Sequence, residues 1–266
     1  MGRLRLAIPL LATVSLTLLG VLPAQAEPAA YTALGDSYSS GVGTRNYYAD
    51  SGNCYRSPDA YPVRVASALG AQLTFAACSG ARIPDIPNQI ASLNASTAYV
   101  TISIGGNDAG FVSVITQCAL PWPWTCWGDI NNANNFIRNT LPGQLDATYD
   151  LIRSRAPNAT VIVVGYPRIF NGQECNFGAR ISSGEQAELN KTADLLTTTI
   201  GARAAAHGFR FVDPRSAFTG HAICSGAEWI NGLSNPIMES YHPNLNGQTG
   251  YVQLLMSQLG VPVNAV

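Results

Sequence analysis

Four short stretches of the sequence place a serine, a glycine, an asparagine and a histidine at comparable positions. They are GDSYSSG with Ser37, CSGA with Gly80, GGND with Asn107 and YHPN with His242. The first three follow directly after short apolar runs typical of buried strands, and the fourth follows the last such run. Because the carboxyl ends of parallel strands lie at one edge of a sheet, we expect the four residues to converge in one crevice there.

These residue types suit acyl transfer at a carboxylic ester, which needs a nucleophile, a base and donors for the developing oxyanion. Ser37 can be the nucleophile, and His242 can be the base that takes its proton and passes it to the leaving group. The candidate oxyanion donors are the backbone N–H groups of Ser37 and Gly80 and the side-chain amide of Asn107. A Gly/Ser-rich strand end alone is a common turn, so this prediction depends on all four positions together.

We expect structural roles for the other histidines and for Asp36. The sequence has three histidines. His207 ends a predicted helix and His221 lies in an irregular stretch, so elimination also favours His242 as the base. Asp36 stands beside the proposed nucleophile, where a carboxylate is expected to brace the turn by hydrogen bonds. No G-x-S-x-G motif occurs, so the nucleophile elbow of the α/β-hydrolases is absent.

Alternating strand and helix patterns predict the elements that must position these residues. β-branched or apolar runs predict strands over 30–34, 72–77, 98–104, 160–166 and 209–212. Amphipathic patterns predict helices over 61–69, 86–93, 136–156 and 182–208. This order indicates a three-layer α/β/α fold with a five-stranded, mostly parallel sheet.

Three stretches interrupt the pattern beyond the carboxyl ends of strands, at 118–129, 171–181 and 216–243. The first contains Trp122, Trp124 and Trp127. These aromatic residues either form a rigid wall for an acyl chain or a lipid interface, or fill space beneath a disulfide. The sequence leaves these alternatives open.

The four blocks resemble the GDSL esterase/lipase family, also called SGNH hydrolases. GDSYSSG, CSGA, GGND and HPN occur in the family's order across about residues 31 to 260. The six cysteines and the GYPR segment at 165–168 are similar to those of its secreted actinobacterial lipases and phospholipases. The resemblance implies a flavodoxin-like strand order, hydrolysis through an acyl-serine intermediate, and no metal or organic cofactor.

The sequence departs from the family pattern at the residue that orients the histidine. The family usually has Asp three residues before the histidine, where this chain has Glu239. Some secreted relatives are implied to use a Ser-His dyad in which a backbone carbonyl replaces the carboxylate. Either Glu239 or the Ser240 carbonyl can orient His242, and the carbonyl is slightly preferred because the longer Glu side chain would have to fold back.

The chain begins with a pattern typical of a secretory signal. Arg3 and Arg5 precede an apolar run over 6–21 that is followed by Ala24-Gln25-Ala26. The run is too short for a transmembrane helix, so we expect a secreted, extracellular protein with a signal over 1–26 and one catalytic domain over 27–266. The mature part has 13 basic and 16 acidic residues and a formal charge of −3. This composition gives no sign of a nucleic-acid surface, and nothing demands more than a monomer.

All six cysteines lie in the mature part, and an even number in an exported chain predicts three disulfides. Fifteen pairings are possible. Proximity along the chain favours Cys54 with Cys78, Cys118 with Cys126, and Cys175 with Cys224. No CxxC pair or helical His pair occurs, which argues against a metal site.

The sequence therefore predicts a secreted serine esterase or lipase that acts on acylglycerols or glycerophospholipids. A carbohydrate acetyl esterase is the enzymatic alternative, and it would lose activity as the acyl chain lengthens. The non-enzymatic alternative is a secreted lipid- or glycan-binding module that kept the fold. The presence of Ser37, Asn107 and His242 together counts against the latter.

Overall fold

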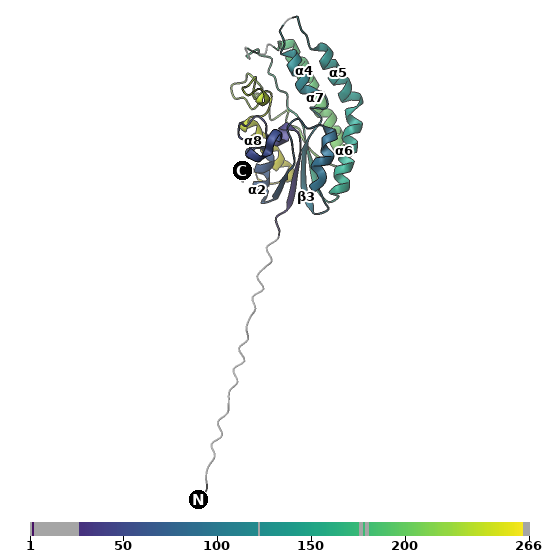
Figure 1. The fold of residues 1–266 in the computed structure, drawn as a ribbon, viewed down its shortest axis with the longest axis vertical. Coiled ribbons are helices and arrows are strands. Elements are labelled where there is room, and N and C mark those ends of the chain that lie inside the picture. The colour runs from purple at the N-terminus through teal and green to yellow at the C-terminus, as the bar shows by residue number, and fades with distance from the viewer. Residues whose placement is uncertain (1, 3–26, 122, 176–177, 179–180, 263–266) are drawn as a thin grey trace.

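Five parallel strands form one sheet at the centre of the protein (Figure 1). The computed structural model describes residues 2, 27–121, 123–175, 178 and 181–262. The strands are β1 (Ala30–Gly35), β2 (Gln72–Phe75), β3 (Thr97–Ser103), β4 (Thr160–Val164) and β5 (Arg210–Val212). Their order is β2-β1-β3-β4-β5, and each neighbouring pair is parallel. The sheet is thus fully parallel, with the flavodoxin-like order that the resemblance implies.

Helices cover both faces of this sheet (Figure 1). On one face α2 (Tyr61–Leu69) packs against α8 (Leu245–Leu259), and on the other α5 (Trp127–Asn139), α6 (Leu141–Arg155) and α7 (Ser183–Ala206) pack together. Shorter helices follow strands at the carboxyl edge: α1 (Ser37–Ser40), α3 (Ile86–Gln89) and α4 (Phe111–Cys118). Four 3₁₀ turns complete the described elements: η1 (Ala49–Cys54), η2 (Ile83–Asp85), η3 (Ile90–Ser92) and η4 (Ile237–Glu239).

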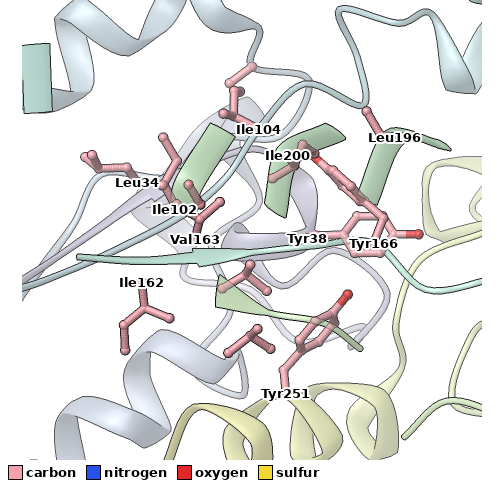
Figure 2. Close-up of a cluster of buried hydrophobic side chains, with 14 of the residues drawn as sticks. Leu34, Tyr38, Ile102, Ile104, Ile162, Val163, Tyr166, Leu196, Ile200 and Tyr251 are labelled. Atoms are coloured by element: carbon pink, nitrogen blue, oxygen red, sulfur yellow. The ribbon is translucent and has the colours of Figure 1, made fainter. Parts of the chain in front are cut away.

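The two covered faces explain why the central strand β4 is continuously apolar over 161–164 rather than alternating. Ile162 and Val163 of β4 are neighbours and must point to opposite faces of the sheet, yet both are buried. Figure 2 shows side chains of the strands between Tyr251 of α8 and Ile200 of α7. Parallel sheets with helices on both faces require such strands.

The prediction of a single helix over 136–156 is wrong. The structure has two helices there, because α5 ends at Asn139 and α6 begins at Leu141. Pro142 lies in the first turn of α6, where a missing N–H is tolerated, but inside a continuous helix its ring would clash with the preceding turn. α5 also begins earlier than predicted, at Trp127. The segment predicted as a helix over 86–93 consists of α3 followed by η3.

Three described helices, α1, α4 and α8, were not expected from the sequence. Asn244 caps α8, since its side chain accepts from the backbone N–H groups of Asn246 and Gly247. α4 follows the segment that carries Asn107, and α8 follows the segment that carries His242, so both helices begin beside the predicted crevice. The stretch over 216–243 contains only η4 among its described helical turns.

Three disulfides join Cys54 to Cys78, Cys118 to Cys126 and Cys175 to Cys224, the pairs that proximity along the chain favours. Among the described residues, no helix combines the length and the apolar character that crossing a bilayer requires. The predicted signal over 1–26 lies outside the described residues except for residue 2, as does Trp122.

Candidate active site

Ser37, Gly80, Asn107 and His242 line one cavity of about 580 Å³. The first three belong to segments that follow β1, β2 and β3, and His242 lies between η4 and α8. The topology therefore brings together the four positions that the sequence predicted to converge. The same cavity has apolar walls that include Phe111, Ile115 and Leu196.

Ser37 is the first residue of α1, directly after β1. Gly35, with φ of 118°, allows the chain to leave the strand in a conformation that L-residues rarely adopt. A Cβ on Gly35 would lie 2.3 Å from the Ser103 carbonyl oxygen, so only glycine fits there. This close contact with β3 fixes the position of the turn that carries the serine.

The His242 imidazole lies between two oxygen atoms. Its Nε2 is 2.8 Å from the Ser37 hydroxyl oxygen, and its Nδ1 is 2.8 Å from the Ser240 carbonyl oxygen. If Nδ1 donates to the carbonyl, Nε2 is left to accept from Ser37, which is the tautomer that a general base needs. Tyr241, with φ of 63°, makes the turn that allows both contacts.

Glu239 is buried, at 1% exposed, but its carboxylate bonds the Tyr47 hydroxyl rather than His242. Its other oxygen, Oε2, has no hydrogen-bond partner among the described residues. Of the two alternatives left open by the sequence, the geometry favours the Ser240 carbonyl as the group that orients the imidazole.

Asn231 holds the loop that presents His242. Its backbone donates to the His242 carbonyl and accepts from the Tyr241 N–H, both at 2.9 Å. Its side-chain amide donates to the carbonyls of Gly43 and Glu239, at 2.9 and 3.3 Å. One side chain thus ties the histidine loop to the segment that follows the nucleophile.

Burial lowers the pKa of the His242 imidazole to about 4, although hydrogen bonds with the backbone at Ser240 and Met238 oppose the shift. The imidazole is therefore neutral near pH 7. A neutral imidazole can accept a proton from Ser37, whereas a protonated one cannot.

The three candidate oxyanion donors belong to residues that line the cavity. The Asn107 side-chain nitrogen donates to the Ala81 carbonyl at 3.0 Å, which leaves its second N–H for the cavity. In the described chain, no hydrogen bond is donated by the backbone N–H of Ser37 or Gly80. The Cys54–Cys78 disulfide and the Ser79 N–H bond to the Cys54 carbonyl hold the segment that carries Gly80.

Asp36 braces the turn, as expected from the sequence. Its carboxylate accepts from the Tyr38 N–H at 3.0 Å and from the Tyr166 hydroxyl at 2.5 Å. Burial raises the pKa of this carboxyl to about 7, and these hydrogen bonds oppose the shift. The Tyr166 hydroxyl also accepts from the Gly106 N–H at 3.3 Å, so it links the turn of Ser37 to the segment of Asn107.

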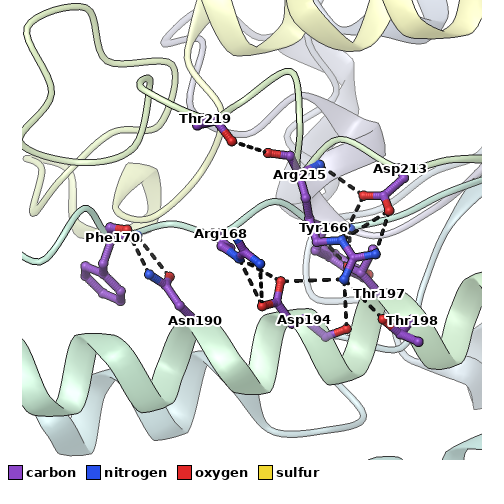
Figure 3. Close-up of polar contacts among 10 residues, drawn as sticks. All are labelled: Tyr166, Arg168, Phe170, Asn190, Asp194, Thr197, Thr198, Asp213, Arg215 and Thr219. Carbon is purple, nitrogen blue, oxygen red and sulfur yellow. Dashed lines mark hydrogen bonds and ion pairs between the residues drawn. The ribbon is translucent and has the colours of Figure 1, made fainter.

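Tyr166 is a positioning residue that sequence reasoning missed. Figure 3 shows it beside Thr197 of α7, whose hydroxyl accepts from the Tyr166 N–H and donates to its carbonyl. Two residues on, Arg168 forms an ion pair with Asp194, also of α7. Asp36, which accepts from the Tyr166 hydroxyl, is 130 residues away along the chain. No local sequence pattern could have revealed that contact.

The remaining histidines do not line this cavity. His207 contacts the carboxylates of Asp146 and Asp150, at 2.9 and 3.2 Å. His221 stacks on Trp229 with ring centroids 4.1 Å apart. Both therefore have structural environments, as the sequence predicted.

The fold and the residues of this cavity define the protein as a carboxylic ester hydrolase. A model of the GDSL-like lipase/acylhydrolase family matches residues 33–249, which is most of the chain. The chain belongs to this family.

Similar proteins include Streptomyces enzymes. A lipase from Streptomyces rimosus is 45% identical over 259 residues, which covers 94% of this chain and 96% of that protein. The crystal structure of an extracellular lipase from Streptomyces rimosus aligns with a TM-score of 0.82 and 46% identity, and covers 86% of this chain and 99% of that one. Phospholipase A1 from Streptomyces albidoflavus aligns with a TM-score of 0.83 and 45% identity, over 86% and 99% of the two chains.

Proposed function

We propose that this protein is a secreted lipase or phospholipase of the A type, which hydrolyses carboxylic esters of acylglycerols or glycerophospholipids and acts as a monomer. The observation that carries the proposal is the 2.8 Å contact between the Ser37 hydroxyl and His242 Nε2 at a cavity with apolar walls. The lipase and phospholipase A1 that the chain resembles support a lipid ester as substrate. The three disulfides support an extracellular location.

In the proposed reaction, the Ser37 oxygen attacks the ester carbonyl carbon while His242 Nε2 takes the hydroxyl proton. The Ser240 carbonyl accepts from Nδ1–H and stabilises the imidazolium. The developing oxyanion accepts from the N–H groups of Ser37, Gly80 and Asn107. When the C–O bond to the alcohol breaks, His242 returns the proton to the leaving oxygen, and the acyl group stays on Ser37. Water, deprotonated by His242, then releases the fatty acid.

Product analysis tests this function. The mature protein and its Ser37→Ala variant are each given phosphatidylcholine micelles, a triacylglycerol emulsion and an acetylated sugar. We expect fatty acid from the lipids with the unchanged protein alone. Release of acetate alone would make the protein a carbohydrate acetyl esterase, and no release from any substrate would leave a binding module.

Glu239→Gln is expected to change kcat for a soluble ester by less than about tenfold. The amide oxygen can still accept from the Tyr47 hydroxyl, and the imidazole keeps its bond to the Ser240 carbonyl. Where a carboxylate does orient the histidine of a serine hydrolase, the matching amide variant loses about 10⁴-fold in kcat. A loss of that size at an unchanged thermal unfolding midpoint would assign the orienting role to Glu239.

The pH dependence of kcat/KM is expected to follow His242. Since only the neutral imidazole accepts the Ser37 proton, kcat/KM for a soluble ester should rise with pH through about 4 and be constant above it. An unperturbed histidine would place this rise near 6.5. NMR titration of the imidazole in Ser37→Ala measures the same group without turnover, and a midpoint above 6 would contradict the prediction.

A further inference from the structure

Large apolar side chains are exposed in two segments that each contribute residues to the cavity wall. The described chain exposes eight large apolar side chains, and six of them lie in the segments 112–127 and 233–237. Four of these six form a set that we call the apolar rim: Val112 at 58% exposed, Leu120 at 40%, Trp124 at 62% and Ile237 at 69%. Single exposed apolar residues are normal, but clustering at a binding cavity marks an interaction site.

Two of the four rim residues belong to the cavity. Val112 of α4 and Ile237 of η4 are both exposed and both line the cavity that contains Ser37. Figure 1 shows α4 and the yellow loops that precede α8 at the same end of the molecule. An acyl chain that passes between Val112 and Ile237 therefore enters along apolar side chains.

The two segments that form the rim carry no charge. Residues 109–128 contain no Asp, Glu, Lys or Arg, and neither do residues 229–238. Clustered Lys or Arg would attract anionic lipids or nucleic acid, and these two segments offer none; Arg82 lines the cavity from another segment. The chemistry of the rim matches an uncharged surface with an apolar interior.

Trp124 lies in a segment that is closed by a disulfide. The disulfide between Cys118 and Cys126 closes the segment, and the Trp124 N–H donates to the Pro121 carbonyl at 3.2 Å. Its exposure contradicts the interpretation of Trp124 and Trp127 as residues that fill space beneath the disulfide, and neither lines the cavity as an acyl-chain wall would. An exposed tryptophan suits the boundary between lipid and water, because one end of its ring is apolar and the other is polar.

We propose that the apolar rim docks on the surface of uncharged lipid aggregates, with zwitterionic phosphatidylcholine as the representative partner. The proposal rests on the proposed lipid-ester function and deepens it, since it names the surface through which substrate reaches Ser37. Binding comes from burial of the rim side chains among the acyl chains and is independent of charge.

The test is sedimentation of the mature protein with vesicles of diether phosphatidylcholine, a lipid that cannot be hydrolysed. Leu120→Ser combined with Trp124→Ser is expected to lower the partition coefficient by about 10- to 100-fold, given the free energy of burying such side chains. Leu245→Ser is the matched control, because Leu245 is 52% exposed outside both segments. Leu245→Ser should bind vesicles and turn over a soluble ester as the unchanged protein does.

Three results would overturn the proposal. They are equal loss of binding in Leu245→Ser, binding that requires anionic lipid and disappears in high salt, and a dimer that the rim substitutions dissociate. If the double variant does not fold, Ile237→Ser replaces it with the same expected direction. Because the ether lipid is not cleaved, vesicle binding through the rim would stand even if the hydrolysis assay showed no lipid cleavage.

Discussion

His242→Gln is expected to lower kcat for a soluble ester by about 10⁴- to 10⁶-fold, the range measured when a serine hydrolase loses its base or its nucleophile. Glutamine has a volume close to that of histidine but no nitrogen that can accept the Ser37 proton at neutral pH. The Ser37 hydroxyl, 2.8 Å from Nε2 in the unchanged protein, would then remain protonated and weakly nucleophilic. KM is expected to change little, because the imidazole contributes to the transition state rather than to ground-state binding.

The double variant Ser37→Ala with His242→Gln separates a shared reaction step from two independent effects. If both residues act in one proton transfer, the double variant should be about as slow as each single variant. His207→Gln is the control for loss of a histidine, since His207 bonds Asp146 away from the cavity. Multiplicative losses in the double variant, or a loss in His207→Gln as large as in His242→Gln, would contradict the proposed pair.

The sheet and the four cavity residues could be predicted because their signals are local. Residues 161–164 form a continuous apolar run, and this pattern alone indicates a strand buried on both faces. Once the strands are parallel, topology places their carboxyl ends together without any knowledge of side-chain contacts. Ser37 and Asn107 therefore meet in one cavity even though 70 positions separate them.

The contacts that hold the site could not be predicted, because they join residues without any spacing rule. Tyr166 reaches Asp36 across 130 positions, and the Asn231 amide reaches the Gly43 carbonyl across 188. The choice between Glu239 and the Ser240 carbonyl stayed open for a related reason. It depends on the backbone turn at Tyr241, and a positive φ at an aromatic residue is not expected from its propensity.

The buried polar residues around the nucleophile show how this fold holds the serine without a nucleophile elbow. The Asp36 carboxylate caps the turn by accepting from the Tyr38 N–H. It also accepts from the hydroxyl of Tyr166, which follows the carboxyl end of β4. Removing one partner of a buried, charge-assisted hydrogen bond costs about 1.5 to 3 kcal/mol. The precision of the site therefore depends on the segment after β4 as well as on β1.

Asn107→Ala is expected to lower kcat for a soluble ester by about 10²- to 10³-fold, with little change in KM, as for other single oxyanion donors. One N–H of the Asn107 amide is bonded to the Ala81 carbonyl, which fixes the plane of the amide and directs the other N–H to the cavity. A donor fixed in this way needs no reorganisation when negative charge develops, so its loss is felt in the transition state. Asn107→Asp, which replaces the donor by an acceptor, should be at least as slow.

Asp108→Ala tests whether Asn107 donates to the oxyanion or only holds two segments together. Asp108 also bonds the segment after Gly80, since its carboxylate accepts from the Ile83 N–H at 3.0 Å, but it does not line the cavity. If Asn107 acts on the oxyanion, Asp108→Ala should lower kcat by less than about tenfold, although both variants lose one bond between the same two segments. Equal losses in the two variants would mean that displacement of this segment, and with it the Gly80 N–H, causes the effect, and the oxyanion role of the Asn107 side chain would be wrong.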